Sequence, residues 1–199
     1  MKYSYLVSVL FICSITLGQE SKSKPELEIK ANFRLQTFLP VHFGNNALAK
    51  AHKPRPAFSM QLNLLEYNHF KAGLGLDFVT YDITNSELIA NLSTSKYTSA
   101  YVLIGYEYKI NQKLLLTPTI GYGSATLDLG SRNSRFGNQG GNEIRIGSIL
   151  DYRIGKTTYV FGGIQYVTNT FDVKTTAEYQ SFFSKSNQLQ LTLGIRFGN

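Results

Sequence analysis

The sequence has a single cysteine, no tryptophan and few charged residues, which make up 17% of its 199 positions. Because the cysteine, Cys13, lies in the apolar segment at the N-terminus, the rest of the chain can form no disulfide, thiolate nucleophile or cysteine metal site. The same apolar segment, Leu6 to Leu17, is shorter than the roughly 20 residues of a membrane-spanning helix. Apolar residues make up 43% of the chain, which excludes disorder, coiled coil and collagen. A single folded domain is expected at this length.

The N-terminus has the features of a secretory signal peptide. Lys2 supplies a positive start, the apolar segment follows, and the small residues Thr16 and Gly18 stand where a signal peptidase requires them. A buried N-terminal helix is the alternative. We expect residues 1–18 to be the signal peptide and residues 19–25 a short periplasmic tail.

From residue 26 onward, apolar residues fall on alternate positions, which is the period of β-strands. The runs are longer than a usual soluble strand and long enough to cross a bilayer at a tilt. We recognise eight runs, at residues 26–39, 57–67, 70–81, 97–110, 113–127, 143–154, 157–168 and 188–197.

The connections between these runs alternate between long and short. Long polar segments cover residues 41–56, 82–96, 128–142 and 169–187, whereas tight turns lie at residues 68–69, 111–112 and 155–156. Short periplasmic turns and long extracellular loops are typical of transmembrane β-barrels. The prediction is an all-β fold, an eight-stranded antiparallel up-and-down transmembrane β-barrel over residues 26–199.

The two alternating faces of the runs differ in composition. One face is apolar and carries no charged residue, as a bilayer requires. The other carries most of the strand glycines and a nearly balanced set of acids and bases. We expect these charges to pair inside the barrel and close its lumen, because unpaired buried charges are costly; a narrow pore is the alternative. The predicted lumen network is Lys30, Arg34, Asp77, Glu107, Arg145, Asp151, Arg153 and Arg196.

Three segments resemble the porin-like outer-membrane β-barrel proteins of Gram-negative bacteria. They are Tyr106 to Asn111, which descends into a tight turn, Ile120 to Gly123, which rises from the next one, and the alternating ending Leu193 to Phe197, after which Gly198 and Asn199 follow. The resemblance implies export, insertion by the outer-membrane assembly machinery, and contact with outer-membrane lipid and lipopolysaccharide.

Some small outer-membrane barrels modify lipid A, so a hydrolytic site is an alternative function. It needs a nucleophile activated by a histidine that a carboxylate orients. His42 could meet Ser59 near the outer rim, but no histidine and serine are paired in the sequence, and His52 and His69 lie in connections. We therefore predict no catalytic residues, no cofactor and no metal site. A secreted soluble barrel that binds an apolar ligand inside is a further alternative.

The net charge of +7 raises the question of an anionic partner. Export argues against nucleic acid, whereas lipopolysaccharide phosphates would suit Arg and Lys on the extracellular rim. The alternative is that these loop charges are simply solvated and bind no specific partner. The candidate residues are Lys50, Lys53, Arg55, Arg132 and Arg135. The sequence thus predicts a monomeric, non-enzymatic integral outer-membrane barrel with a structural, envelope-stability or surface-interaction role.

Overall fold

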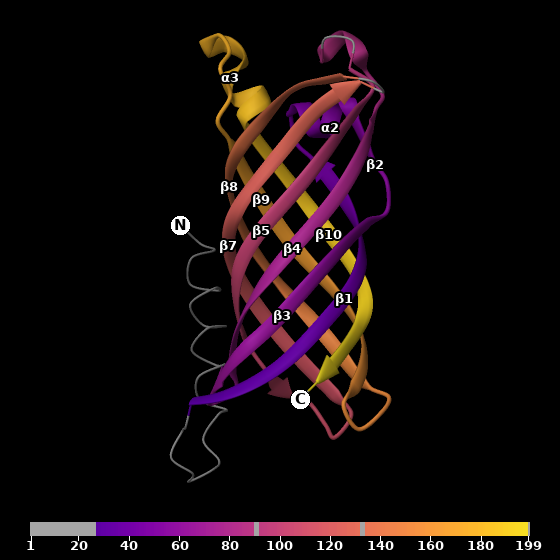
Figure 1. Ribbon diagram of the computed structural model, residues 1–199, viewed down its shortest axis with the longest axis vertical. Helices are drawn as coiled ribbons and strands as arrows, with labels where there is room; N and C mark the ends of the chain where they lie inside the picture. The colour runs from indigo at the N-terminus through magenta and orange to yellow at the C-terminus, as the bar shows by residue number, and fades with distance from the viewer. Residues whose placement is uncertain (1–26, 90–91, 132–133, 199) are drawn as a thin grey trace, which may run out of the picture.

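The structure is a computed structural model that describes residues 27–89, 92–131 and 134–198, without the side chains of residues 131–136. The predicted signal peptide and periplasmic tail lie outside the described residues. Eight long strands form a tall barrel with helical segments at one end (Figure 1). The long strands are β1 (Leu27–Phe43), β3 (Ala57–Tyr67), β4 (Phe70–Ile83), β5 (Thr94–Tyr106), β7 (Leu114–Ser131), β8 (Ser134–Arg153), β9 (Thr158–Phe171) and β10 (Lys185–Gly198).

Each long strand pairs antiparallel with the next one along the chain, and β1 pairs with β10 to close the sheet. This confirms the predicted eight-stranded antiparallel up-and-down barrel. Of the described residues, no helical segment has the length and apolar character to cross a membrane. The shorter elements are α2 (Ala47–Ala51), β2 (His52–Pro54), η1 (Ser86–Leu88), β6 (Tyr108–Lys109) and α3 (Ala177–Ser184).

The turn between β3 and β4 shows how tight the short connections are. Tyr67 pairs with Phe70, so only Asn68 and His69 form the turn, and both have positive φ, 46° and 71°. Positive φ at both central residues is typical of the type I′ turn, whose twist matches that of the flanking strands.

The prediction of a long loop at residues 128–142 is wrong. In the described part of this segment, β7 extends to Ser131 and β8 begins at Ser134, and the two strands pair, with Leu127 opposite Gln139 and Asp128 opposite Asn138. The Gly- and Asn-rich composition is typical of a loop, but two adjacent strands can satisfy each other's backbone groups wherever their register continues. The hairpin therefore rises beyond the shorter strands at the end that also carries α2 and α3 (Figure 1).

The two faces of the barrel are arranged as predicted. Apolar side chains lie outside: Leu193 is 66% exposed and Ile120 is 55% exposed. Charged and amide side chains lie inside, among them Asp151, which is 0% exposed. A soluble barrel with an apolar ligand inside would need the opposite arrangement, so the structure contradicts that alternative.

A β-bulge in β3 shifts the alternation near the turn. The pairing with β4 shifts between Asn63 and Leu65, and both Leu64 and Leu65 are exposed. One extra residue on one strand reverses the faces of all residues beyond it. Glu66, which strict alternation would place outside, therefore has a largely buried side chain.

Glycine makes room for large side chains in the narrow lumen. A Cβ atom at Gly75 would overlap the ring of Tyr101, and one at Gly123 would overlap the Tyr101 backbone and Cβ. An eight-stranded barrel is only just wide enough for its interior side chains. Glycine at these two positions is thus required by the close approach of Tyr101.

Candidate functional site: a charged lumen below an apolar layer

Among the described residues, the barrel interior holds eight buried Arg, Lys, Asp and Glu side chains whose formal charges cancel. Four are basic and four are acidic, and all lie on the inward face of the wall. The set consists of Arg34, Lys71, Arg145, Arg196, Asp77, Glu107, Glu143 and Asp151.

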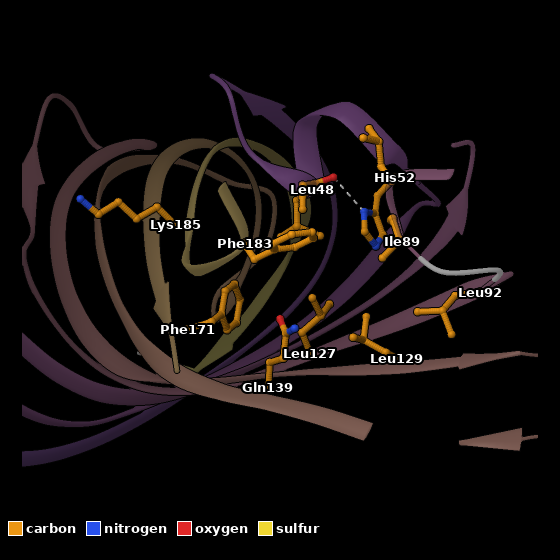
Figure 2. Close-up of a pocket in the computed structure, with 12 residues that line it drawn as sticks. Leu48, His52, Ile89, Leu92, Leu127, Leu129, Gln139, Phe171, Phe183 and Lys185 are labelled. Carbon is orange, nitrogen blue, oxygen red and sulfur yellow. Dashed lines mark hydrogen bonds between the residues drawn. The ribbon is translucent and has the colours of Figure 1, made fainter. Parts of the chain in front are cut away.

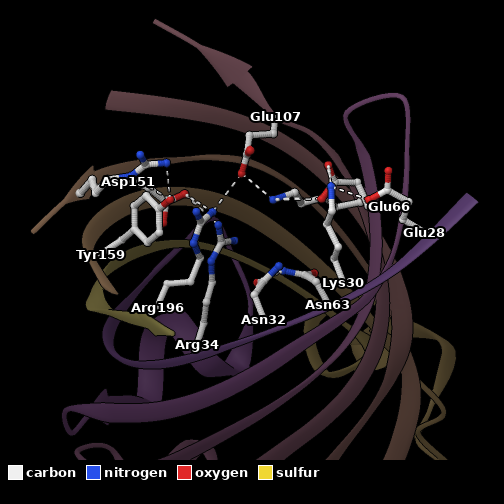
Figure 3. A network of polar contacts seen from close by, with 12 residues as sticks. Glu28, Lys30, Asn32, Arg34, Asn63, Glu66, Glu107, Asp151, Tyr159 and Arg196 are labelled. Atoms are coloured by element: carbon white, nitrogen blue, oxygen red, sulfur yellow. Dashed lines mark hydrogen bonds and ion pairs between the residues drawn. The ribbon is translucent and has the colours of Figure 1, made fainter. Parts of the chain in front are cut away.

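Asp151 joins two arginines that would otherwise repel each other. Arg34 of β1 and Arg196 of β10 are directly opposite in the strand register. Asp151 Oδ2 accepts hydrogen bonds from Arg34 Nη2 at 2.8 Å and from Arg196 Nη1 at 3.3 Å (Figure 3). Its carboxylate therefore compensates both guanidinium groups in a site from which water is excluded.

The network continues from Arg196 across the lumen. Glu107, which lies between β5 and β6, accepts from Arg196 Nη1 at 3.0 Å and from Lys71 Nζ at 2.6 Å (Figure 3). Opposite charges therefore alternate from Arg34 through Asp151, Arg196 and Glu107 to Lys71.

Beyond Lys71 the chain of ion pairs runs to the end of the barrel that carries the short turns. Lys71 Nζ lies 3.7 Å from Glu66 Oε2, and Lys30 Nζ lies 3.4 Å from Glu66 Oε1 and 2.7 Å from Glu28 Oε2. Exposure rises in this direction, since Lys30 and Glu28 are partly exposed. The outermost pairs are therefore screened by solvent and contribute less to stability than the buried ones.

A second cluster lies nearer the helical end, around Arg145. Its Nη2 donates to Asp77 Oδ2 at 3.0 Å and to Glu143 Oε1 at 2.6 Å. The guanidinium Cζ lies 3.3 Å from the centre of the Tyr101 ring, a stacked cation–π contact. Tyr101 donates to Asp77, and Tyr97 donates to Glu143. Each carboxylate thus has a basic and a phenolic partner.

The predicted lumen residues fall into two groups. Six of them belong to the two buried clusters: Arg34, Asp77, Glu107, Arg145, Asp151 and Arg196. The other two lie nearer the short-turn end. Lys30 is partly exposed, and Arg153 is exposed with its guanidinium donating to Tyr159 Oη at 3.0 and 2.7 Å.

The predicted network omits Lys71, Glu143 and Glu66. Lys71 and Glu143 stand on the same alternating face as Asp77 and Arg145, so the alternation alone could have placed them in the lumen. The alternation could not have placed Glu66 in the lumen, because the β-bulge in β3 moves this residue to the other face.

An apolar layer covers the Arg145 cluster on the side of the helical end. It is a continuous buried cluster to which α2 contributes Leu48. Asn46 caps this short helix by accepting from Ala49 N at 2.9 Å. The cluster consists of Phe38, Leu48, Ala57, Val79, Tyr81, Tyr97, Ala125, Leu127 and Phe171.

The structure does not bring His42 to Ser59. His42 instead hydrogen-bonds to Tyr81 Oη at 2.9 Å and to Ser186 Oγ at 3.3 Å. Ser59 contacts Gln36 and Tyr101. Among the described side chains, no group of three His, Cys, Asp or Glu residues could hold a metal ion.

Above the apolar layer lies a pocket of about 210 Å³, formed at the helical end by the connections and by the ends of β7, β8, β9 and β10 (Figure 2). Its wall is mostly apolar, and His52 is its most buried polar side chain. His52 Nδ1 donates to Ala47 O at 3.1 Å, and burial lowers the pKa of its imidazole. The lining residues are Ala47, Leu48, His52, Leu88, Ile89, Leu92, Leu127, Leu129, Gln139, Phe171, Phe183 and Lys185.

The candidate lipopolysaccharide-facing residues are only partly described. Lys50 of α2 and Lys53 of β2 are exposed at the helical end. Arg55 is also exposed, but it makes a two-point ion pair with Asp82, at 2.6 and 3.0 Å. Arg132 and the side chain of Arg135 lie outside the described residues.

No protein-family model and no curated protein matches this sequence. Solved structures do. The chain is 12% identical to the outer membrane protein OprG from Pseudomonas aeruginosa, over 86% of this chain and 96% of that one, with a TM-score of 0.51. It is 11% identical to a major outer membrane protein from Thermus thermophilus, over 85% and 99% of the two chains, also with a TM-score of 0.51.

The chain has the fold of an eight-stranded outer-membrane β-barrel. The outer membrane enzyme PagL is also similar, at 11% identity over 81% of this chain and 97% of that one, with a TM-score of 0.44. A likeness at that level carries no argument for catalysis in this chain.

Proposed function

We propose that the protein is a non-enzymatic integral protein of the outer membrane, with a structural, envelope-stability or surface-interaction role and a closed lumen. The observation that carries the proposal is the pairing of an apolar outer wall with a charge-neutral interior. A charged side chain that faces lipid at mid-depth costs about 2 to 4 kcal/mol, and the apolar face of this barrel avoids that cost.

Side-chain packing supports a closed lumen. Arg145 is stacked on Tyr101 and bonded to two acids, and the Arg34, Asp151 and Arg196 group lies across from Glu107 and Lys71. An ion that passed through would have to separate these buried pairs, and a buried charge without its partner is strongly unfavourable. A narrow pore is therefore the less favoured function.

We also propose that the helical end of the barrel faces outward and contacts lipopolysaccharide. The connections that carry Lys50 and Lys53 would face the outer leaflet, where their ammonium groups suit phosphate. Arg55 is less suited, because Asp82 already compensates its charge. We further propose that the protein is monomeric and that the outer-membrane assembly machinery inserts it.

A lipid-modifying enzyme is the second candidate, and the contact between His42 and Ser186 is the observation that favours it. Ser186, however, is only 1% exposed, and His42 is held by the phenol of Tyr81 rather than by a carboxylate. A nucleophile that substrate cannot reach does not support acyl transfer. The enzyme would change purified lipopolysaccharide and lose this activity in His42→Ala; we expect an unchanged lipid profile with both proteins.

Membrane fractionation combined with gel mobility before and after boiling tests location and barrel formation together. We expect the protein in the outer-membrane fraction, with a shift in mobility on heating. Recovery of the folded chain in the soluble fraction without detergent would overturn the proposal. Planar-bilayer recordings should show no steady conductance, and stable single-channel steps would replace the closed lumen with a pore.

A further inference from the structure

The pocket at the helical end is blind. Leu127 and Phe171 line it and also belong to the apolar cluster below it. Tyr97 in that cluster donates to Glu143, which is bonded to Arg145. A molecule that entered from this end would therefore meet a packed floor and then the ion-paired interior. The pocket can hold a ligand, but it does not lead into the lumen.

The size and lining of the pocket define a class of ligand. Apolar cavities of about 150 Å³ bind benzene, so the pocket's volume of about 210 Å³ suits a substituted single ring or a medium-length alkyl chain. Side chains from eight separate elements converge on it, including Leu48, Leu129 and Phe183, together with Ile89 and Leu92, which follow η1. Predominantly apolar walls with few placed polar groups are typical of small-molecule sites.

His52 provides the polar group. Its side chain belongs to a residue only 8% exposed, and Nδ1 donates to the Ala47 carbonyl. A neutral imidazole with its proton on Nδ1 has an acceptor at Nε2. Nε2 is buried and has no hydrogen-bond partner among the described residues.

The other polar groups of the pocket do not favour an anion. Figure 2 shows the ammonium of Lys185 extending away from the pocket, while Gln139 lies at its lower wall. A buried acceptor without a nearby cation favours a ligand that is uncharged and carries a hydrogen-bond donor.

We propose that this pocket binds a small, uncharged, hydroxyl-bearing apolar molecule, such as a substituted phenol or a medium-chain alcohol, with the hydroxyl donating to His52 Nε2. The apolar body of the ligand fills the space between α2, η1 and the tops of β7 and β9. The proposed function includes no small-molecule ligand, so this site goes beyond it.

The test uses the absence of tryptophan from the chain. In Phe183→Trp, the single tryptophan lines the pocket, and the bromine atom of 4-bromophenol quenches its fluorescence on binding. Leu193→Trp is the matched control, because Leu193 lies on the lipid-facing wall and reports only partition of the probe into the bilayer. Both variants are measured as full-length protein in lipid nanodiscs, after heat-modifiable mobility has shown that the barrel is folded.

We expect saturable quenching in Phe183→Trp and only linear quenching in Leu193→Trp. Adding His52→Leu to Phe183→Trp should weaken 4-bromophenol about 3- to 10-fold and leave 4-bromotoluene, which lacks the hydroxyl, unchanged. Adding Leu129→Phe instead should weaken both probes by filling the space, which keeps the test usable if His52→Leu does not fold.

Linear quenching in both reporter variants would overturn the binding site. Saturable quenching with equal affinity for the two probes would overturn the role of His52. Neither result bears on membrane location, which fractionation tests separately.

Discussion

Asp151 Oδ2 bridges Arg34 and Arg196, which lie directly opposite each other on β1 and β10. β1 and β10 are the two strands that close the barrel, so this carboxylate compensates two like charges at the closing seam. Asp151 comes from β8, two strands away from β10, and reaches the seam across the interior. Asp151 thus links the ion pairs of the lumen to the two strands that close the barrel.

Asp151→Asn should destabilise the barrel by about 3 to 5 kcal/mol, because it leaves the buried guanidinium of Arg34 without its carboxylate and leaves Arg196 with Glu107 alone. Unfolding by guanidinium chloride in detergent micelles, followed by far-ultraviolet circular dichroism, measures the loss. Asp82→Asn is the control, because Asp82 pairs with Arg55 on the exposed surface. Equal midpoints for the two variants would show that the bridge contributes nothing to stability.

Gly75→Ala should destabilise the barrel by about 1 to 3 kcal/mol, because the added methyl group overlaps the Tyr101 ring. Gly140→Ala is the matched control, since nothing lies within 4 Å of a Cβ atom there. Combining Gly75→Ala with Tyr101→Leu should cost less than the sum of the two single changes, as for residues in direct contact. Strict additivity in this double-mutant cycle, measured by the same unfolding assay, would contradict the close approach.

The packing of α2 at the helical end of the barrel should weaken as the pH falls below about 6.5, the ordinary pKa of histidine. Burial lowers the pKa of His52 in the folded state, so the unfolded state binds the proton more readily. The stabilisation is therefore fully present above pH 6.5 and is lost as the pH decreases. Hydrogen exchange of the α2 amides between pH 7.5 and 5, corrected for the intrinsic rate, measures it.

The matched variant for the pH experiment is His52→Gln, which has no titratable group at this position. Its α2 amides should show no loss of protection over the same range. An identical pH dependence in the variant and in the native protein would assign the effect to another group.

Lys50→Gln combined with Lys53→Gln should weaken binding of purified lipopolysaccharide several-fold and make the remaining binding less sensitive to salt. Surface plasmon resonance on nanodisc-embedded protein measures the affinity. Lys113→Gln combined with Lys156→Gln removes the same charge at the opposite end of the barrel, where both residues are exposed. An equal loss of affinity in both double variants would contradict the proposal that lipopolysaccharide contacts Lys50 and Lys53.

The alternation of apolar and polar residues was sufficient to predict the number of strands, their antiparallel arrangement and the face on which nearly every strand side chain lies. It placed Arg34 and Asp151 inside and Ile120 and Leu193 outside. It failed for Glu66, because one extra residue in β3 reversed the phase. It also failed for residues 128–142. Their composition is typical of a loop, but β7 and β8 extend into this segment as a paired hairpin.

The sequence by itself determined which side chains face inward, because the period of a strand is two residues and each residue carries that information locally. Which inward charges meet was decided only by the tertiary structure. Arg34 and Asp151 lie 117 positions apart in the chain, and Lys71 and Glu107 lie 36 apart. Their contacts depend on the stagger of neighbouring strands and on the closure of β1 against β10, to which all eight strands contribute. The pocket beside His52 depends on the same closure, since it brings connections far apart in the sequence to one end of the barrel.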